Sequence, residues 1–174
     1  FMYDYNTSNE LEVTVALIGQ CNSGKTTLRN LHIGNPVDDE TSSSVGVNLF
    51  DRLEFYDEFS VRMNIWDIPG NEKLTPYTST YIQKADAVVV MYDTTSKLAY
   101  SQTDKLLKYV KTLKSGEDYC LSIFGNKNDL LSKRLTGTNK MMRLSLRHGV
   151  PLYEGSLKSE INLDKMFYEL AKEC

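Results

Sequence analysis

The strongest chemical signal in this sequence is a glycine-rich segment that follows an apolar stretch. It runs Gly19-Gln20-Cys21-Asn22-Ser23-Gly24-Lys25-Thr26 and fits the pattern G-x-x-x-x-G-K-[ST]. Glycine permits backbone turns that point several N–H donors at one phosphate group, and the dipole of a helix starting there adds to the attraction. Lys25 would bridge the outer phosphates, and the Thr26 hydroxyl would bind Mg²⁺. A glycine turn with an incidental lysine is the alternative, which the strand–loop–helix context disfavours.

A second polar motif, Asn126-Lys127-Asn128-Asp129, directly follows another apolar stretch. A carboxylate in the plane of a guanine base can accept hydrogen bonds from its N1–H and 2-amino groups. Adenine offers neither hydrogen, so such a site rejects it by a factor on the order of 10⁴. Alone, this tetrapeptide is more often a polar turn. At the carboxyl end of a parallel strand, where open α/β sheets bind ligands, and together with the phosphate loop, it favours guanine.

These two motifs need elements that bring them to one edge of a sheet. Apolar or alternating stretches predict six strands, at residues 13–19, 47–55, 59–66, 87–92, 119–125 and 150–153, the second and third forming a hairpin. Helical periodicity predicts helices at residues 25 to about 33, at 106–113 with an end before Gly116, around Met142 and Leu146, and at 163–170. We therefore expect an α/β fold, with a mostly parallel six-stranded sheet and helices on both faces.

Composition limits the other functions that the chain could have. Its 174 residues, 41% hydrophobic and 25% charged, fit one globular domain, and a net charge of −3 argues against nucleic acid as a partner. Three cysteines without metal-ligand spacing favour a reducing cytoplasm. No apolar stretch reaches the roughly 20 residues of a membrane span. We expect residues 1–10 to be an N-terminal extension, with Phe1 a vector remnant, and residues 11–174 to form the domain.

Nearly the whole chain resembles the Ras superfamily of small GTPases, and within it the Rab branch. Beyond the two motifs, five segments are similar to that family: Ser44-Val45-Gly46-Val47, Trp66-Asp67-Ile68-Pro69-Gly70-Asn71-Glu72, Thr78-Ser79-Thr80-Tyr81, Met91-Tyr92-Asp93-Thr94-Thr95 and Gly155-Ser156-Leu157-Lys158. The first two resemble the end of the first switch and the second switch, and the last resembles the final guanine loop. The resemblance implies the G domain of a P-loop NTPase.

The resemblance also implies a role for each matching position. Nucleotide contacts would come from Gly19, Asn22, Ser23, Gly24, Lys25, Thr26, Thr27, Gly70, Asn126, Lys127, Asp129, Ser156, Leu157 and Lys158. Among these, Asn126 and Asp129 would read the base, and the Lys127 stem would cover its face. Thr26, Ser44 and Asp67 would hold Mg²⁺. Lys25, Gly70 and Asn71 would be the catalytic residues of GTP hydrolysis.

Partners follow from the same resemblance. The aromatic effector triad of Rab proteins falls at Leu49, Trp66 and Tyr81, with Leu49 replacing an aromatic residue. Effectors, exchange factors and GTPase-activating proteins would bind there and at the switches. We expect a cytoplasmic protein that attaches peripherally to internal membranes only through a lipidated tail. Cys174 alone lacks the residues of a C-a-a-X signal.

Three departures from the family pattern bear on hydrolysis and nucleotide release. Asn71 replaces the water-orienting glutamine and is one methylene shorter, so we expect slow hydrolysis. Pro69 replaces a small residue and should stiffen the start of the second switch. Val37 replaces the phenylalanine that stacks on guanine, so we expect fast nucleotide release. A partner that supplies the function of the missing glutamine is the alternative for Asn71.

Two further readings stay open. A pseudo-GTPase would bind guanine nucleotide and act as an interaction module without turnover, whereas an ATP-using P-loop enzyme is disfavoured by the base motif. Two patterns are interpreted as structural. Lysines at 105, 108, 111 and 114 are taken as one solvated helix face, and Met141 and Met142 as core packing.

Overall fold

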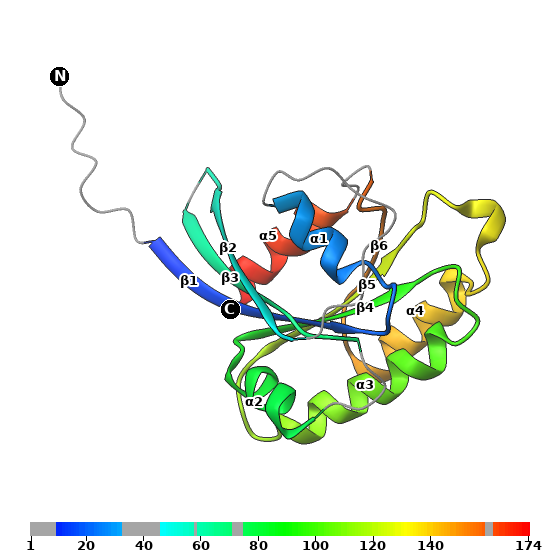
Figure 1. Cartoon of the computed structure of the whole chain (residues 1–174), viewed down its shortest axis with the longest axis horizontal. Coiled ribbons are helices and arrows are strands. Elements are labelled where there is room, and N and C mark those ends of the chain that lie inside the picture. Colours follow the sequence, from blue (N-terminus) through cyan, green and yellow to red (C-terminus); the bar gives the residue numbers. More distant parts are fainter. Residues whose placement is uncertain (1–9, 33–45, 58, 71–74, 159–161) are drawn as a thin grey trace.

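Six strands form a single sheet in the computed structural model of the chain, which describes residues 10–32, 46–57, 59–70, 75–158 and 162–174 (Figure 1). The strands are β1 (Glu10–Gly19), β2 (Asn48–Phe55), β3 (Ser60–Asp67), β4 (Ala87–Asp93), β5 (Cys120–Asn126) and β6 (Leu152–Glu154). Their order is β2-β3-β1-β4-β5-β6, and only the β2–β3 pair is antiparallel. The predicted fold class, strand number and hairpin are confirmed.

Helices cover both faces of this sheet. They are α1 (Lys25–His32), α2 (Pro76–Lys84), α3 (Ala99–Leu113), α4 (Thr138–His148) and α5 (Leu163–Glu173), with a short 3₁₀ turn, η1, at Leu131–Lys133. In Figure 1, α1 and α5 lie on one side of the sheet and α2, α3 and α4 on the other. Successive residues of β1 face opposite sides, so Val15 and Leu17 join the core under α5, and Ala16 and Ile18 join the core under α3.

Helix α2 was not anticipated from hydrophobic periodicity. Its start carries a local signal instead, because Thr75 caps the helix by accepting the Thr78 N–H at 3.3 Å. Pro76 then occupies the first turn, where its missing N–H costs nothing. The Thr-Pro pair could therefore have revealed this helix.

The two patterns interpreted as structural need correction. Lys114 does not belong to a solvated face, because it is only 3% exposed and its ammonium donates to the carbonyl oxygens of Gln83 and Ala85. Those carbonyls lie at the C-terminal end of α2. Lys114, which directly follows α3, therefore satisfies the last carbonyl groups of the neighbouring helix. Met142 is not core packing either, since it is 50% exposed while its neighbour Met141 is fully buried.

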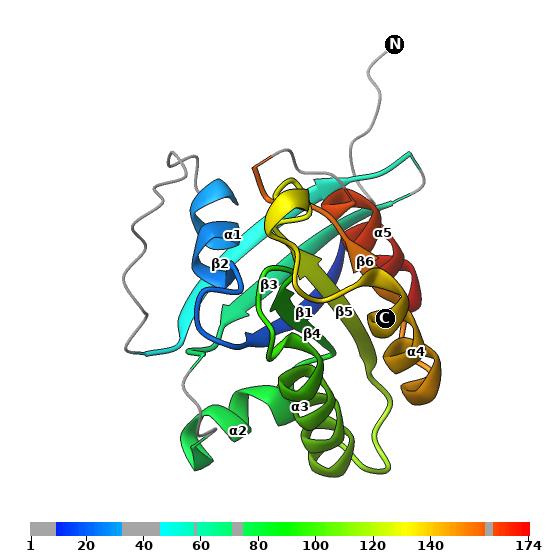
Figure 2. The same cartoon turned by 90° about the vertical axis from the view of Figure 1, so that its right-hand side faces the viewer.

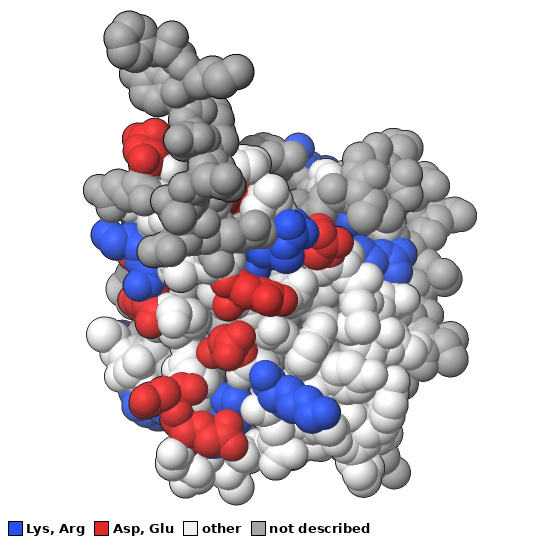
Figure 3. Space-filling view, turned by 90° about the vertical axis from the view of Figure 1, so that its left-hand side faces the viewer, with Lys and Arg blue, Asp and Glu red and all other residues white. Residues whose placement is uncertain are grey.

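The carboxyl ends of the parallel strands bring the predicted motifs to one edge, which Figure 2 faces. Gly19, Asp67, Asp93 and Asn126 end the neighbouring strands β1, β3, β4 and β5. On the face shown in Figure 3, acidic and basic side chains are interspersed, and neither sign covers the surface that is described. No helix within the described ranges has the length and apolar character that crossing a membrane requires.

Candidate nucleotide-binding site

The phosphate loop connects the end of β1 to the start of α1. Gly24 has a φ of +104°, and a Cβ at this position would lie 2.2 Å from Asn126 Nδ2, so no other residue fits. Lys25 is 6% exposed, and its ammonium donates to the carbonyl oxygens of Gly19 and Gln20, both at 2.9 Å. Burial lowers the pKa of Lys25, and the nearby Asp67 carboxylate opposes that shift. The loop thus holds a buried cation at its centre.

Asp67 and Thr26 place two candidate metal ligands side by side. The Thr26 hydroxyl donates to Asp67 Oδ2 at 3.2 Å, while Asp67 Oδ1 is buried and has no hydrogen-bond partner among the described residues. Burial raises the pKa of this carboxyl, and Lys25 opposes the shift most strongly. Hydroxyl and carboxylate oxygens are the ligands that Mg²⁺ prefers, with water and phosphate completing its shell. The donor set therefore fits Mg²⁺. Ser44, the third predicted ligand, lies outside the described residues.

Asn126 joins the phosphate loop to the last guanine loop. Its Nδ2 donates to the Ser23 carbonyl oxygen and its Oδ1 accepts the Leu157 N–H, both at 3.1 Å, and the residue is 5% exposed. The amide therefore fixes the spacing between the phosphate end and the base end of the site. Direct contact between Asn126 and the base stays a prediction, and this bridging role was not anticipated from the sequence.

Lys127 and Asp129 follow at the same edge. Lys127 has a φ of +66°, and its ammonium donates to Asp93 Oδ2 at 2.6 Å, which anchors the side chain that was predicted to cover the base. Thr94 Oγ1 donates to the Lys127 carbonyl oxygen at 3.1 Å. Asp129 is exposed, so its carboxylate is accessible to a base. Sequence reasoning missed Asp93, although a carboxylate at the end of a buried strand was the available signal.

A partly buried polar network connects the two guanine loops, which are the loop after β5 that carries the base motif and the last guanine loop after β6. Arg134 donates to Asn128 Oδ1 at 2.7 Å and forms an ion pair with Glu154, which ends β6. The Tyr92 hydroxyl donates to Glu154 Oε1 at 2.5 Å, and burial raises the pKa of Tyr92. The network thereby joins the loop after β5 to the strand before Ser156. No motif in the sequence indicated it.

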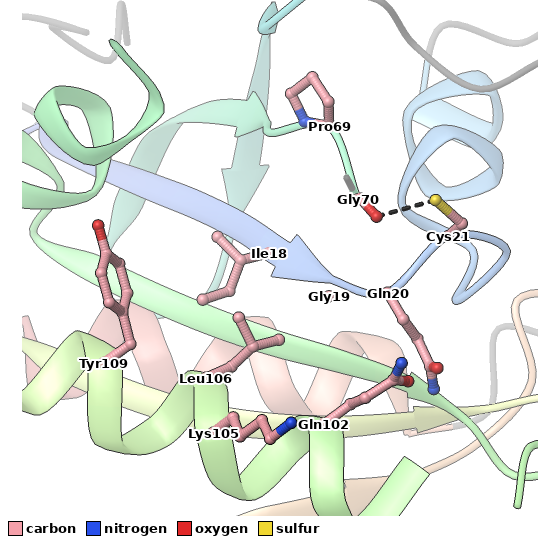
Figure 4. A pocket seen from close by; sticks show the side chains of 10 residues that line it. All are labelled: Ile18, Gly19, Gln20, Cys21, Pro69, Gly70, Gln102, Lys105, Leu106 and Tyr109. Atoms are coloured by element: carbon pink, nitrogen blue, oxygen red, sulfur yellow. Dashed lines mark hydrogen bonds between the residues drawn. The ribbon is translucent and has the colours of Figure 1, made fainter. Parts of the chain in front are cut away.

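The start of the second switch lies against the phosphate loop. A Cβ on Gly70 would approach Gly19 O and Cys21 N to 2.8 Å, and the Cys21 thiol donates to the Gly70 carbonyl oxygen at 2.8 Å (Figure 4). Pro69 is buried beside it. A cavity of about 680 Å³ adjoins this contact and reaches Leu106 and Tyr109 on α3. Asn71 lies outside the described residues.

The three predicted effector positions come together on the surface. Leu49 is 61% exposed and lies opposite Trp66 in the β2–β3 register. The rings of Trp66 and Tyr81 pack edge to face with centroids 5.3 Å apart. Tyr77, which the sequence did not single out, extends this cluster, since its ring lies 5.2 Å from that of Tyr81. Tyr77 thus adds an aromatic ring to the triad beside Tyr81.

Comparison with known proteins agrees with this geometry. The family model described as Ras family matches residues 14–174. The Ras-related protein RABD1 of Arabidopsis thaliana is 28% identical over 168 residues, which cover 95% of this chain and 82% of the relative. The Ras-related proteins Rab-1 of Theileria parva and Theileria annulata are each 26% identical over 159 residues, which cover 91% of this chain and 72% of each relative.

Proposed function

This chain belongs to the Ras family as a Rab-like small GTPase, and from that premise we propose that it is a slow molecular switch in vesicle trafficking. It binds GTP or GDP with Mg²⁺ at the carboxyl edge of the sheet. The observation that carries the proposal is the Asn126 bridge, which joins the phosphate loop to the last guanine loop within one site. Ser44 and Gly70 turn toward the γ-phosphate when GTP is bound and are released after hydrolysis.

Each end of the nucleotide has its own set of residues. At the phosphate end, the backbone N–H groups of the loop and the Lys25 ammonium stabilise negative charge that grows on the phosphate oxygens. Thr26, Ser44 and Asp67 would hold Mg²⁺, which would neutralise phosphate charge when bound. At the base end, Asp129 would accept two hydrogen bonds from guanine. The backbone of Ser156 and Leu157 would donate to its exocyclic oxygen, for which the Leu157 N–H would share or exchange the bond that it makes with Asn126 Oδ1.

Slow turnover follows from Asn71. Phosphoryl transfer depends almost entirely on positioning and electrostatics, so a shorter amide holds the attacking water less well. A pseudo-GTPase without significant turnover is the second candidate. It is favoured by Asn71, by Pro69, whose ring fixes φ beside Gly70, and by Val37, which lies outside the described residues. In both cases, partners bind Leu49, Trp66 and Tyr81, and membrane attachment would require a covalent lipid anchor.

The nucleotide carried by the purified protein tests the proposal. The protein is denatured and the released nucleotide identified by ion-exchange chromatography, before and after incubation with GTP and Mg²⁺. We expect guanine nucleotide at about one per protein, with GDP increasing slowly over time. An Asp129→Ala variant should purify with less of it. Persistent GTP would select the pseudo-GTPase, whereas adenine nucleotide or none would contradict both candidates.

A further inference from the structure

We propose that Cys120 and Cys174 form a dithiol that closes to an intramolecular disulfide when the protein meets a hydroperoxide. Cys120 begins β5 and Cys174 follows the last turn of α5, so the sequence separates them by almost a third of the chain. Both are free thiols, Cys174 exposed and Cys120 partly so. This modification site is independent of the proposed nucleotide function.

Three contacts bring the two cysteines to the same place. Cys120 packs against the core cluster that contains Leu170 and Ala171 in the last turn of α5, the turn that Cys174 follows. The Asp86 carbonyl oxygen, which accepts the Cys120 N–H at 2.9 Å, also lies 3.9 Å from Cys174 Sγ. The Cys174 N–H donates to the Leu170 carbonyl oxygen at 3.1 Å, so the end of α5 is held in place by its own helix. A disulfide needs a sulfur–sulfur bond of about 2.05 Å, which rotation of the two side chains about their Cα–Cβ bonds would have to form.

The pair lies at the opposite edge of the sheet from the nucleotide site. Cys120 and Asn126 are the first and last residues of β5, which a strand of this length separates by about 20 Å. In Figure 1, the C-terminus accordingly lies at the end of the sheet away from the loop between β1 and α1. A bond there would enclose β5, α4, β6 and α5, and with them both guanine loops. It would restrain this half of the domain without touching the nucleotide.

The chemistry balances with one hydroperoxide. One thiolate attacks the peroxide oxygen and becomes a sulfenic acid, and the partner sulfur then displaces water to form the disulfide. With hydrogen peroxide, two thiols and one peroxide give one disulfide and two waters. Desolvation of the sulfur atoms raises the pKa of both thiols, so the resting pair is protonated and the first step is slow. Cys21 has no neighbouring cysteine among the described residues and therefore serves as a control thiol within the same chain.

Peptide mapping of the full chain tests this assignment. The protein is treated with one equivalent of hydrogen peroxide, alkylated and digested without reductant. We expect a cross-linked peptide pair that contains Cys120 and Cys174 and is lighter by two hydrogens than its reduced form. Cys120→Ser and Cys174→Ser should each abolish the pair, whereas Cys21→Ala should leave it. Oxidation should raise the midpoint of thermal unfolding by about 4–16 °C, since the closed loop restricts the unfolded chain.

A measurement on the unmutated protein covers the case in which a serine variant does not fold. Phenylarsine oxide binds two neighbouring thiols at once, so it should protect Cys120 and Cys174 together from alkylation while Cys21 still reacts. Protection of neither thiol, a cross-link that includes Cys21, or disulfides only between molecules would each overturn the proposal.

Discussion

The Cys21 thiol donates a hydrogen bond to the Gly70 carbonyl oxygen across 2.8 Å, and this contact joins the phosphate loop to the start of the second switch. Gly70 is the residue whose N–H would meet the γ-phosphate. The hydrogen bond therefore competes with the motion that the proposed switch requires.

Removing this thiol should speed GTP hydrolysis. Cys21→Ala eliminates a hydrogen bond with a net value of about 1 kcal/mol, so single-turnover hydrolysis should rise up to about fivefold. Cys21→Ser keeps a donor at the same position and should behave like the original protein. Equal rates for the alanine and serine variants would show that the contact does not restrain Gly70.

Asn126 and Asp129 should have separable effects on binding. Asn126→Ala removes two hydrogen bonds between loops and should weaken binding of GDP and inosine diphosphate by the same factor, about 5- to 100-fold. Asp129→Ala should instead reduce the preference for GDP over inosine diphosphate. Inosine lacks the 2-amino group, which would donate a hydrogen bond to the carboxylate. Isothermal titration calorimetry of each variant with both nucleotides gives the ratio of the dissociation constants for GDP and inosine diphosphate. A changed GDP-to-inosine ratio in Asn126→Ala would instead assign this residue a direct base contact.

Magnesium-dependent stabilisation should weaken in acid. Burial raises the pKa of Asp67, and only the ionised carboxylate can hold Mg²⁺. The gain in unfolding temperature on adding Mg²⁺ to the GDP-bound protein should be complete well above this raised pKa and lost as pH falls through it. Asp67→Asn should show a small gain at every pH. GDP binding itself is measured at each pH as the control. If it does not change and the Mg²⁺-dependent gain in unfolding temperature of the original protein is constant from pH 8 to pH 5, Asp67 does not hold the metal ion.

Asn71→Gln should restore faster turnover. The longer side chain reaches further toward an in-line water, so single-turnover hydrolysis should rise by roughly 10- to 100-fold. Asn71→Ala provides the matched control and should be no faster than the original protein. If the glutamine variant hydrolyses GTP at the original rate, a partner rather than this residue sets the speed.

The polar network that connects the guanine loops should contribute to stability. Tyr92→Phe removes a buried donor to Glu154 and should lower the free energy of unfolding by about 1–3 kcal/mol. Tyr153→Phe removes the same atom from a partly buried ring on β6 and serves as the control. Urea denaturation of both variants provides the comparison, and equal losses would contradict the network's role.

The sequence by itself determined the six strands, four of the five α-helices and the two motifs. Alternation and helical spacing are local properties, and the glycine-rich loop needs its residues in a fixed order, so both are visible without a fold. Periodicity failed for α2, whose Thr75-Pro76 start was the stronger signal. It also failed for Met142 and Lys114, because which helix face is buried depends on the elements packed against it.

Only the tertiary structure decided which distant residues share a site. Asn126 meets Ser23 across 103 positions, Thr26 meets Asp67 across 41, and Arg134 meets Glu154 across 20. No local pattern records such pairs, since they arise where parallel strands end at one edge of the sheet. Cys120 and Cys174 were hidden as well, because they approach each other only where the end of α5 packs over the start of β5.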